Sequence, residues 1–472
     1  MVRDTTYTDD LSSEHHNSAD KTCFQNRKML CSESLTRRKF LARSGTLCMA
    51  ASAFPYFVKA SALGRGGVPP PSGRVTIGCI GVGNMGFWHL KSFLGFSDVQ
   101  VLAVCDVFAN KRDRAKGEIE RRYGNADSKA YNDYRELIAR SDIDAVYIAA
   151  PDHWHALMTI DAAKAGKHVY CQKPLTRTFA EGLAVRNAVQ NHRVVFQHGT
   201  QQRSDARMVF GCELVLNGRI GKLTRVKLSI PSGRQIPPQR VEPVPEGFDY
   251  DMWLGPAPWA PYTSKRCSCE EQNWYFISDY CIGYLAGQGV HAFDSAQQGS
   301  GMDHTGPVEI KGIATFPTDG LYDTALTWNI EYTFANGLVW ECLDFTQERF
   351  KQFGSPQYGG ILFEGTNGWV FIWRNQVEAE PKSLLREVIG PEEIHLHTSS
   401  DHERDFIECI KSGLPTVAPV DVALRSTTYC YLADIATRLA RKIKWDPINQ
   451  WIVGDDEATR MLSRSYREPW RL

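Results

Sequence analysis

The sequence lacks a net charge, a paired cysteine pattern and an apolar run long enough to span a membrane. Its 54 lysine and arginine residues balance 54 aspartate and glutamate residues, so we expect neither nucleic acid nor an anionic membrane as a partner. Its 13 cysteines are closely spaced only at Cys267-Ser268-Cys269, which does not suit a zinc site. These absences favour reduced thiols, no metal, and a small neutral or mixed-polarity molecule as the partner.

The N-terminal segment has the pattern of an export signal. Arg37 and Arg38 form a twin-arginine pair, an apolar run follows over 45–58, and Ala60 and Ala62 mark a cleavage site. We predict a signal peptide over 1–62, a linker over 63–73, and export of the folded protein by the twin-arginine translocon to the periplasm or another extracytoplasmic space. The run is too short for a permanent membrane span. Pro55 disfavours the alternative, a buried helix.

A dinucleotide-binding pattern follows the leader. An apolar strand over 75–80 ends at a glycine turn, a helical pattern begins at residue 84, and a second strand over 99–105 ends at Asp106. In such a unit the glycines allow a tight turn, close approach to a pyrophosphate and helix packing, while the acid binds the adenosine ribose. The predicted cofactor-binding residues of this turn are Gly81, Gly83, Asn84, Met85, Gly86 and Asp106.

The charge of Asp106 would repel a ribose phosphate, so the sequence favours NAD over NADP. Lys111 and Arg112 follow closely and leave NADP possible, although a solvated helix face explains them as well. An exported protein finds no ready pool of nicotinamide. We therefore expect NAD to be tightly bound and carried out with the protein.

The pattern of strands and helices predicts an α/β protein with two domains, since roughly 410 residues remain after the leader. Alternating strands and helices over 74–200 predict a Rossmann doubly wound parallel sheet. Residues 201–402 contain alternating strand patterns and predict an α+β domain with a large open, mostly antiparallel sheet. Residues 403–472 are predicted to form a C-terminal helical segment.

Two motifs after later strands carry a family resemblance. Residues 151–155 read Pro-Asp-His-Trp-His, and 172–174 read Gln-Lys-Pro. With the glycine turn, they resemble the Gfo/Idh/MocA family of nicotinamide-dependent sugar and polyol oxidoreductases. Segments 253–258, 289–294 and 467–470 are similar to its exported, twin-arginine branch.

The resemblance implies roles for both motifs. It implies that Pro151, His155 and Gln172 border the cofactor and that Lys173 projects into the cleft as a catalytic, electrostatic partner of the reacting oxygen. The family's usual glutamate before the lysine is Gln172 here. Without that negative neighbour the lysine should lose its charged form more readily.

The family's second signature ends in a histidine, which is His291 here and the candidate general base. The acid that stands four residues before it is Gly287 in this sequence. Asp294, three residues on, either orients His291 or caps a helix. The candidate substrate-binding residues are Arg203 after the last Rossmann strand, Tyr280 from the preceding loop with Asp279 as a weaker candidate, and Asp294.

A second possible ligand cluster lies near the C-terminal segment. His395 and His397 alternate along a probable strand, and His402 and Glu403 follow. No second cluster fixes a metal geometry, so solvated polar residues explain them better.

Three functions fit these features. The first is an exported oxidoreductase that moves a hydride between NAD and a secondary alcohol of a sugar, glycoside or cyclitol. The second is an NAD-dependent glycoside-cleaving enzyme that oxidises, eliminates and re-reduces; the characteristic tyrosine-containing loop of such relatives is not evident. The third is a non-catalytic sugar- or nucleotide-binding relative. The resemblance also implies a homo-oligomer formed through the open sheet.

Overall fold

The computed structural model describes residues 69–268, 273–344, 359–374 and 376–472. The predicted signal peptide over 1–62, the start of the linker and Cys269 therefore lie outside the described residues. None of the described helices is long and apolar enough to cross a membrane.

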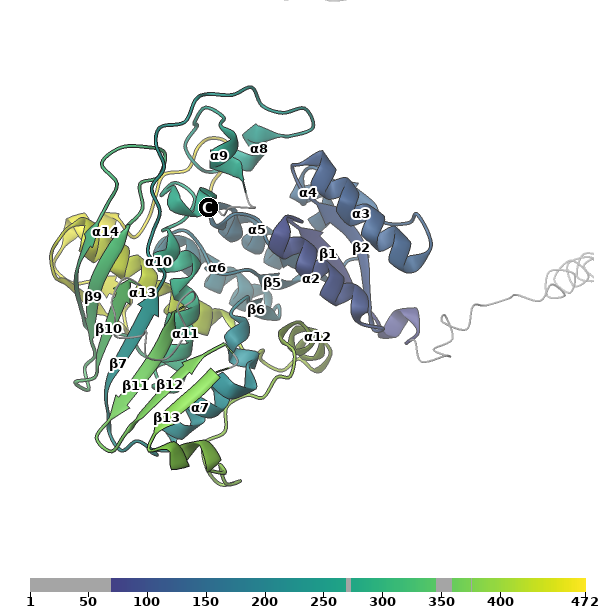
Figure 1. The fold of residues 1–472 in the computed structure, drawn as a ribbon. Helices are drawn as coiled ribbons and strands as arrows, with labels where there is room; N and C mark the ends of the chain where they lie inside the picture. The colour runs from purple at the N-terminus through teal and green to yellow at the C-terminus, as the bar shows by residue number, and fades with distance from the viewer. Residues whose placement is uncertain (1–68, 269–272, 345–358, 375) are drawn as a thin grey trace, which may run out of the picture. The chain divides into compact units, whose positions relative to one another are not determined.

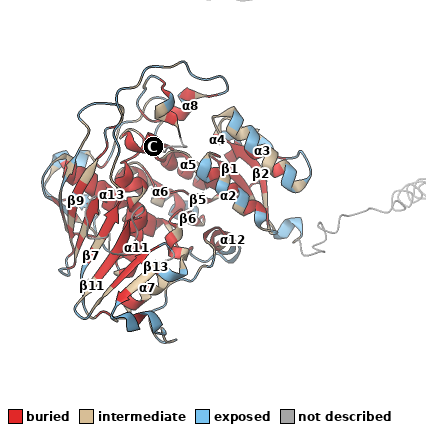
Figure 2. Ribbon diagram, viewed as in Figure 1, coloured by how far each residue is buried: buried red, intermediate tan, exposed pale blue. Residues whose placement is uncertain are grey.

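The first layer is a six-stranded parallel sheet in the order β3-β2-β1-β4-β5-β6 (Figure 1). All four residues of β4 are buried, as expected for a parallel strand covered on both faces. The neighbouring strands β5 and β6 are also mostly buried (Figure 2). The strands are β1 Val75–Ile80, β2 Val99–Cys105, β3 Lys129–Tyr131, β4 Ala145–Ile148, β5 His168–Cys171 and β6 Phe196–His198. The connecting helices are α2 Asn84–Gly95, α3 Ala109–Tyr123, α4 Tyr134–Ile138, α5 Asp152–Lys164 and α6 Phe179–His192.

The second sheet has nine strands in the order β13-β12-β11-β7-β10-β9-β8-β14-β15. Strands β7 and β10 run parallel, and the other neighbouring pairs are antiparallel. The bounds are β7 Leu223–Ile230, β8 Glu309–Thr315, β9 Thr327–Thr333, β10 Val339–Asp344, β11 Gly360–Gly365, β12 Trp369–Trp373, β13 Gln376–Glu380, β14 Ile443–Asp446 and β15 Trp451–Ile452. The predicted fold class, a Rossmann sheet followed by a mostly antiparallel sheet, is confirmed.

Helices α7 Ala206–Leu216, α11 Gly289–Gly299 and α13 Val420–Arg438 pack on the inner face of the second sheet. The opposite face carries cross-strand ion pairs, such as Arg225 with Glu341 on β10 and Lys227 with Glu364 on β11, each at 2.7 Å. This face is therefore strongly polar along β7. Assembly through the open sheet stays a prediction.

The C-terminal part of the chain joins both sheets. Helix α12 His402–Ser412 packs against α2, and its Phe406 and Ile407 belong to a core shared with β1, β2 and α2. Strands β14 and β15 extend the nine-stranded sheet, which helical periodicity did not predict. The remaining elements are η2 Pro71–Gly73, η3 Gln201–Ser204, α8 Tyr250–Leu254, α9 Ser264–Cys267, η4 Asn273–Phe276, α10 Tyr284–Gly287, η6 Lys382–Arg386 and α14 Asp456–Arg460.

Candidate active site

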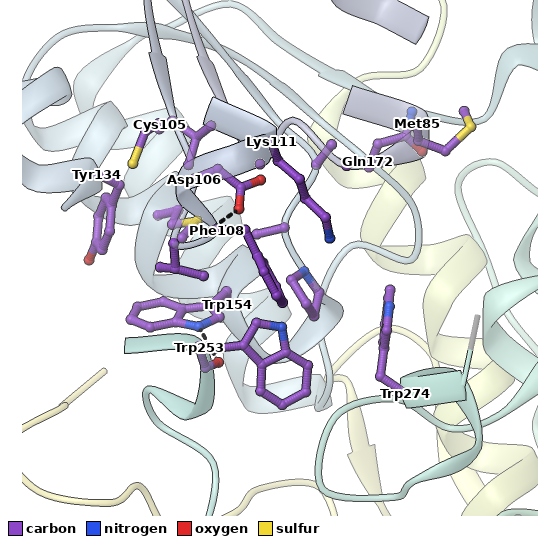
Figure 3. Close-up of a pocket in the computed structure, with 18 of the residues that line it drawn as sticks. Met85, Cys105, Asp106, Phe108, Lys111, Tyr134, Trp154, Gln172, Trp253 and Trp274 are labelled. Atoms are coloured by element: carbon purple, nitrogen blue, oxygen red, sulfur yellow. Dashed lines mark hydrogen bonds between the residues drawn. The ribbon is translucent and has the colours of Figure 1, made fainter. Parts of the chain in front are cut away.

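A cavity lies at the carboxyl ends of the parallel strands, where α/β sheets bind ligands (Figure 3). Its wall includes the predicted residues Gly81, Gly83, Asn84, Met85, Asp106, Pro151, Gln172 and Lys173. Aromatic side chains from the second half of the chain, Trp253 and Trp274, complete the wall. The glycine turn and the lysine motif therefore face one space.

Two positions of the turn must be glycine, because other backbone atoms lie too close to them for a side chain. Gly81 has φ +79°, and a Cβ there would lie 2.6 Å from the carbonyl carbon of Ala149. A Cβ at Gly86 would lie 1.8 Å from the oxygen of Gly81, so helix α2 packs directly on the turn without Gly86 reaching the cavity wall. The turn thus has the shape of a pyrophosphate cradle, which fits a dinucleotide.

Asp106 is fixed at the end of β2 by the backbone around it. One carboxylate oxygen accepts from the amide of Val82 at 2.8 Å, and the other accepts from the amide of Phe108 at 2.9 Å. Burial raises the pKa of Asp106, against these hydrogen bonds. Lys111 also lines the cavity, and its Nζ lies 4.0 Å from the centre of the Phe108 ring. The adenosine end of the cavity therefore contains both the predicted acid and a lysine.

A strap over residues 247–249 packs against the β2–α3 turn, whose Phe108 lines this end of the cavity. The ring of Phe248 stacks on Phe108, with centroids 3.8 Å apart and planes 9° apart. The backbones also pair: the amide of Ala109 donates to the oxygen of Gly247 at 2.8 Å, and the amide of Asp249 donates to Val107 at 3.0 Å. The strap brings the second half of the chain directly onto the β2–α3 turn.

Lys173 is buried in the cavity wall, with 8% of its surface exposed. Its Nζ donates to the carbonyl oxygen of Gly287 at 2.7 Å and to the hydroxyl of Tyr275 at 3.1 Å. Burial lowers the pKa of Lys173, and the nearby Asp152 carboxyl opposes this shift. Lys173 is therefore an amine that can change its protonation state, with a phenol beside it.

Asp152 begins helix α5, lines the same cavity and is only 1% exposed. Burial raises its pKa to about 7, while the Cys281 thiol and the Lys173 ammonium act in the opposite direction. A carboxyl and an amine with shifted pKa values thus occupy one enclosed wall, which is an arrangement found at catalytic sites.

His291 lies in the first turn of α11 and is 3% exposed. The side-chain amide of Gln202, oriented to satisfy both of its neighbours, donates to Nδ1 of His291 at 2.6 Å and accepts from Nε of Arg374 at 3.0 Å. Burial, followed by the charge of Lys173, lowers the pKa of His291 well below its usual value. The neutral ring then carries its proton on Nε2.

The same two-domain pattern appears in protein-family models. The model described as "Oxidoreductase family, NAD-binding Rossmann fold" matches residues 75–200. The model described as "Oxidoreductase family, C-terminal alpha/beta domain" matches residues 231–472. The chain belongs to the Gfo/Idh/MocA oxidoreductase family. The family predicted from the sequence, and with it the class of NAD(P)-dependent oxidoreductase, is confirmed.

Individual relatives match parts of this Gfo/Idh/MocA chain. A levoglucosan dehydrogenase of Pseudarthrobacter phenanthrenivorans is 33% identical over 154 residues, which cover 32% of this chain and 39% of the relative. A glycosyl hydrolase family 109 protein of Shewanella sp. (strain ANA-3) is 40% identical over 119 residues, or 24% of this chain and 26% of the relative. The match spans well under half the length of each of these curated relatives.

A solved structure shows the same fold over most of this Gfo/Idh/MocA chain. The aldose-aldose oxidoreductase of Caulobacter crescentus has a TM-score of 0.58 at 18% sequence identity. The comparison covers 79% of this chain and 99% of that protein. The two proteins therefore share both the parallel sheet and the second sheet.

Arg203 and Asp294 of this Gfo/Idh/MocA protein lie outside the cavity wall. Nε of Arg203 donates to the Asp294 carboxylate at 2.7 Å, and Arg203 also pairs with Asp303 at 2.7 Å. Both Arg203 and Asp294 are at most 3% exposed, so this is a buried structural ion pair. The suggestion that Asp294 orients His291 is wrong, because Gln202 makes that contact.

Three further predicted residues, His155, Tyr280 and Asp279, lie behind the cavity wall and are not part of it. The ring nitrogens of His155 lie 2.8 Å from the carbonyl oxygens of Pro174 and Ala150, which join the loops after β4 and β5. Tyr280 is fully buried and packs edge-on against Trp253 at 4.9 Å. Asp279 contributes only its carbonyl oxygen, which accepts from Arg464 at 3.2 Å. These residues hold the loops that carry the wall.

The possible metal ligands of the sequence are engaged elsewhere. Nε2 of His397 lies 2.6 Å from the Asp405 carboxylate, and His402 contacts the carbonyl oxygen of His198 at 2.8 Å. Among the residues that the structure describes, no group of three or more His, Cys, Asp or Glu side chains could hold a metal. Cys267 is buried as a free thiol.

Sequence reasoning missed several members of the site. Asp152 stood inside the quoted 151–155 motif, but its type alone gave no sign that it would be buried beside Lys173. Trp274 and Tyr275 are adjacent aromatic residues in the sequence, and this signal could have marked them as candidates for the cavity wall. Phe108 follows Asp106 by two residues, whereas its stacking partner Phe248 could not be found without the fold.

Proposed function

We propose that this protein oxidises a secondary alcohol of a sugar, glycoside or cyclitol, with NAD as the hydride acceptor. The observation that carries the proposal is Lys173, an amine of lowered pKa in the wall of the cavity that the glycine turn also lines. When bound, NAD supplies the acceptor for the hydride. The levoglucosan dehydrogenase among the relatives supports a carbohydrate substrate.

Lys173 acts as the proton acceptor in this proposal. Its neutral Nζ takes the hydroxyl proton as the alcohol becomes a carbonyl, and the Gly287 oxygen and the Tyr275 hydroxyl fix its position. His291, suggested by the sequence as the base, is held by Gln202 with its proton on Nε2. In this state His291 donates a hydrogen bond and cannot accept a proton at Nε2.

The strap over 247–249 supports a retained cofactor. Its stacking on Phe108 and its backbone hydrogen bonds hold the β2–α3 turn, and Asp106 and Phe108 of this turn line the adenosine end. The twin-arginine pattern supports export to the periplasm or another extracytoplasmic space. An exported protein with a retained cofactor can cycle it between oxidised and reduced forms.

The first test identifies the nucleotide and the reaction together. Mature protein beginning at Leu63 is denatured, and any released nucleotide is identified by mass spectrometry and absorbance. We expect stoichiometric NAD or NADH, and we expect secondary alcohols of sugars to reduce the bound NAD. Release of NADP would contradict the prediction that the protein binds NAD in preference to NADP. A protein that is empty and binds neither nucleotide would overturn the proposal.

A strap variant provides the control for retention. Phe248→Ala removes the stacked ring and is expected to lose its nucleotide during dialysis, because Phe108 at the adenosine end is no longer held in place. Trp451→Ala removes a 57% exposed aromatic ring on β15 and should retain as much nucleotide as the parent protein. Equal retention by both variants would show that the strap does not hold the cofactor.

Glycoside cleavage is the second candidate function. The Tyr275 hydroxyl beside Lys173 supplies a further group that could remove a carbon-bound proton after oxidation of the sugar ring. The family 109 relative supports this candidate. Aglycone released from a nitrophenyl glycoside without accumulation of NADH would favour cleavage over simple oxidation.

A further inference from the structure

A buried row of three side chains leads from helix α12 to the cavity wall. Nδ1 of His89, on α2, lies 2.6 Å from Oε1 of Glu403, and Nε2 of His89 lies 2.8 Å from the amide nitrogen of Gln172. His89 is fully buried, while Glu403 and Gln172 are 3% and 4% exposed. Of the three, Gln172 lines the cavity. We call this set the Glu403–His89–Gln172 relay.

The chemistry of the three groups decides where the protons lie. Burial would raise the pKa of Glu403, but the contact with His89 outweighs it, and the net pKa is lowered. The resulting carboxylate, 2.6 Å from Nδ1, favours the ring proton of His89 on that nitrogen, so Nε2 is left with a lone pair. Gln172 must then donate its N–H to Nε2. This leaves the Gln172 oxygen to accept from the backbone amide of Lys173, at 3.3 Å.

A glutamate at position 172 would not fit this relay. A carboxylate has no proton to give to the lone pair of a neutral imidazole. Either His89 or the new carboxylate would have to take up a proton. The relay therefore has one carboxylate, Glu403, at the end away from the cavity. The side chain next to Lys173 is the amide of Gln172.

We propose that Glu403 and His89 are positioning residues for the reaction, which hold Gln172 as an oriented amide and keep negative charge away from the residue adjoining Lys173. The proposal rests on the proposed function only through the role of Lys173. It explains why this chain has glutamine where its family usually has glutamate. An amide at position 172 leaves Lys173 able to be a neutral acceptor.

Other charged and titratable groups face Lys173 and His89. Lys173 is faced by Asp152 on α5, His291 on α11, Arg374 after β12, Tyr275 and Cys281. The His89 ring lies 4.6 Å from the Tyr147 ring and 5.4 Å from the Tyr170 ring, and His402 adjoins Glu403. A test must therefore change the relay while leaving these groups in place.

The test is a swap of the two side chains at the ends of the relay, made in the full chain. Gln172→Glu and Glu403→Gln each leave the relay with two carboxylates or with none, and both are expected to lower the Tm at pH 8. The double variant rebuilds the relay in reverse, with a carboxylate at position 172 accepting from Nε2 and an amide at position 403 donating to Nδ1. We expect the double variant to recover most of the Tm that the single variants lose.

The pH dependence of the reaction gives a second readout. In the double variant the carboxylate adjoins Lys173. The rise of the alcohol-oxidation rate with pH should move to higher pH by about one unit.

Each outcome decides the proposal. Additive losses of Tm would show that the residues are not coupled, whether or not the protein has the proposed activity. Coupled Tm values with an unmoved pH profile would overturn the positioning role and leave a structural relay. If the single variants fail to fold, a folded double variant supports the relay and an unfolded one overturns it. Glu341→Gln, at a partly exposed ion pair, is the matched control and should change neither readout.

Discussion

Replacing Lys173 by methionine is expected to lower kcat for alcohol oxidation by about a thousandfold. Methionine has a similar length but can neither accept the hydroxyl proton nor donate to the Tyr275 hydroxyl. The folded protein should survive, because burial already disfavours the charged amine at this position. Steady-state kinetics with NAD and the best sugar alcohol would measure the loss, which should appear in kcat much more than in KM.

Lys116→Met is the matched control. Lys116 lies on α3, is about a third exposed and pairs with Glu120 one turn on. Its loss should cost only about 0.5 kcal/mol of stability and leave kcat unchanged. A Lys173→Met variant that keeps kcat within tenfold of the parent protein would remove Lys173 from the mechanism. NAD binding measured in the same variant separates a lost proton acceptor from a damaged cavity.

The cofactor half of the site could be predicted because its chemistry is local. Backbone atoms approach Gly81 and Gly86 so closely that only glycine fits at these two positions of the turn. Asp106 stands at the end of the next strand. Short sequence spacing fixes these relationships in any βαβ unit. The parallel sheet could be predicted for the same reason, since strands and helices alternate over short distances.

The substrate half could not be predicted in the same way, because its contacts join residues far apart in sequence. Gln202 takes the place beside His291 that the sequence suggested for Asp294, and Asp294 is occupied by Arg203. Phe248 meets Phe108 through a strap from the other half of the chain. Residue type and spacing carry no information about which of several buried polar groups becomes the partner.

Replacing Asp152 by asparagine is expected to stabilise the protein at pH 8 by roughly 4 kcal/mol, from about three pKa units at 1.36 kcal/mol each. Burial raises the folded-state pKa of Asp152 to about 7, above its unfolded value of about 3.9. Its protonated form is therefore favoured by folding, and that stability is present below pH 4 and lost as the pH rises through 7. Asparagine does not ionise and avoids this loss.

The same substitution should also change the reaction, since Asp152 is the carboxyl that most raises the pKa of Lys173. Its removal leaves the amine neutral at lower pH, so the rate of alcohol oxidation should begin to rise at a lower pH than in the parent protein. Denaturant unfolding at pH 4 and pH 8 measures the first effect, and a pH–rate profile measures the second. Asp142→Asn, at an exposed pair with Arg140, should gain no stability at pH 8 and should leave the pH–rate profile unchanged. A variant whose gain in stability is equal at both pH values would show that burial does not raise the pKa of the Asp152 carboxyl. Asp152 would then not be the group that sets the protonation of Lys173.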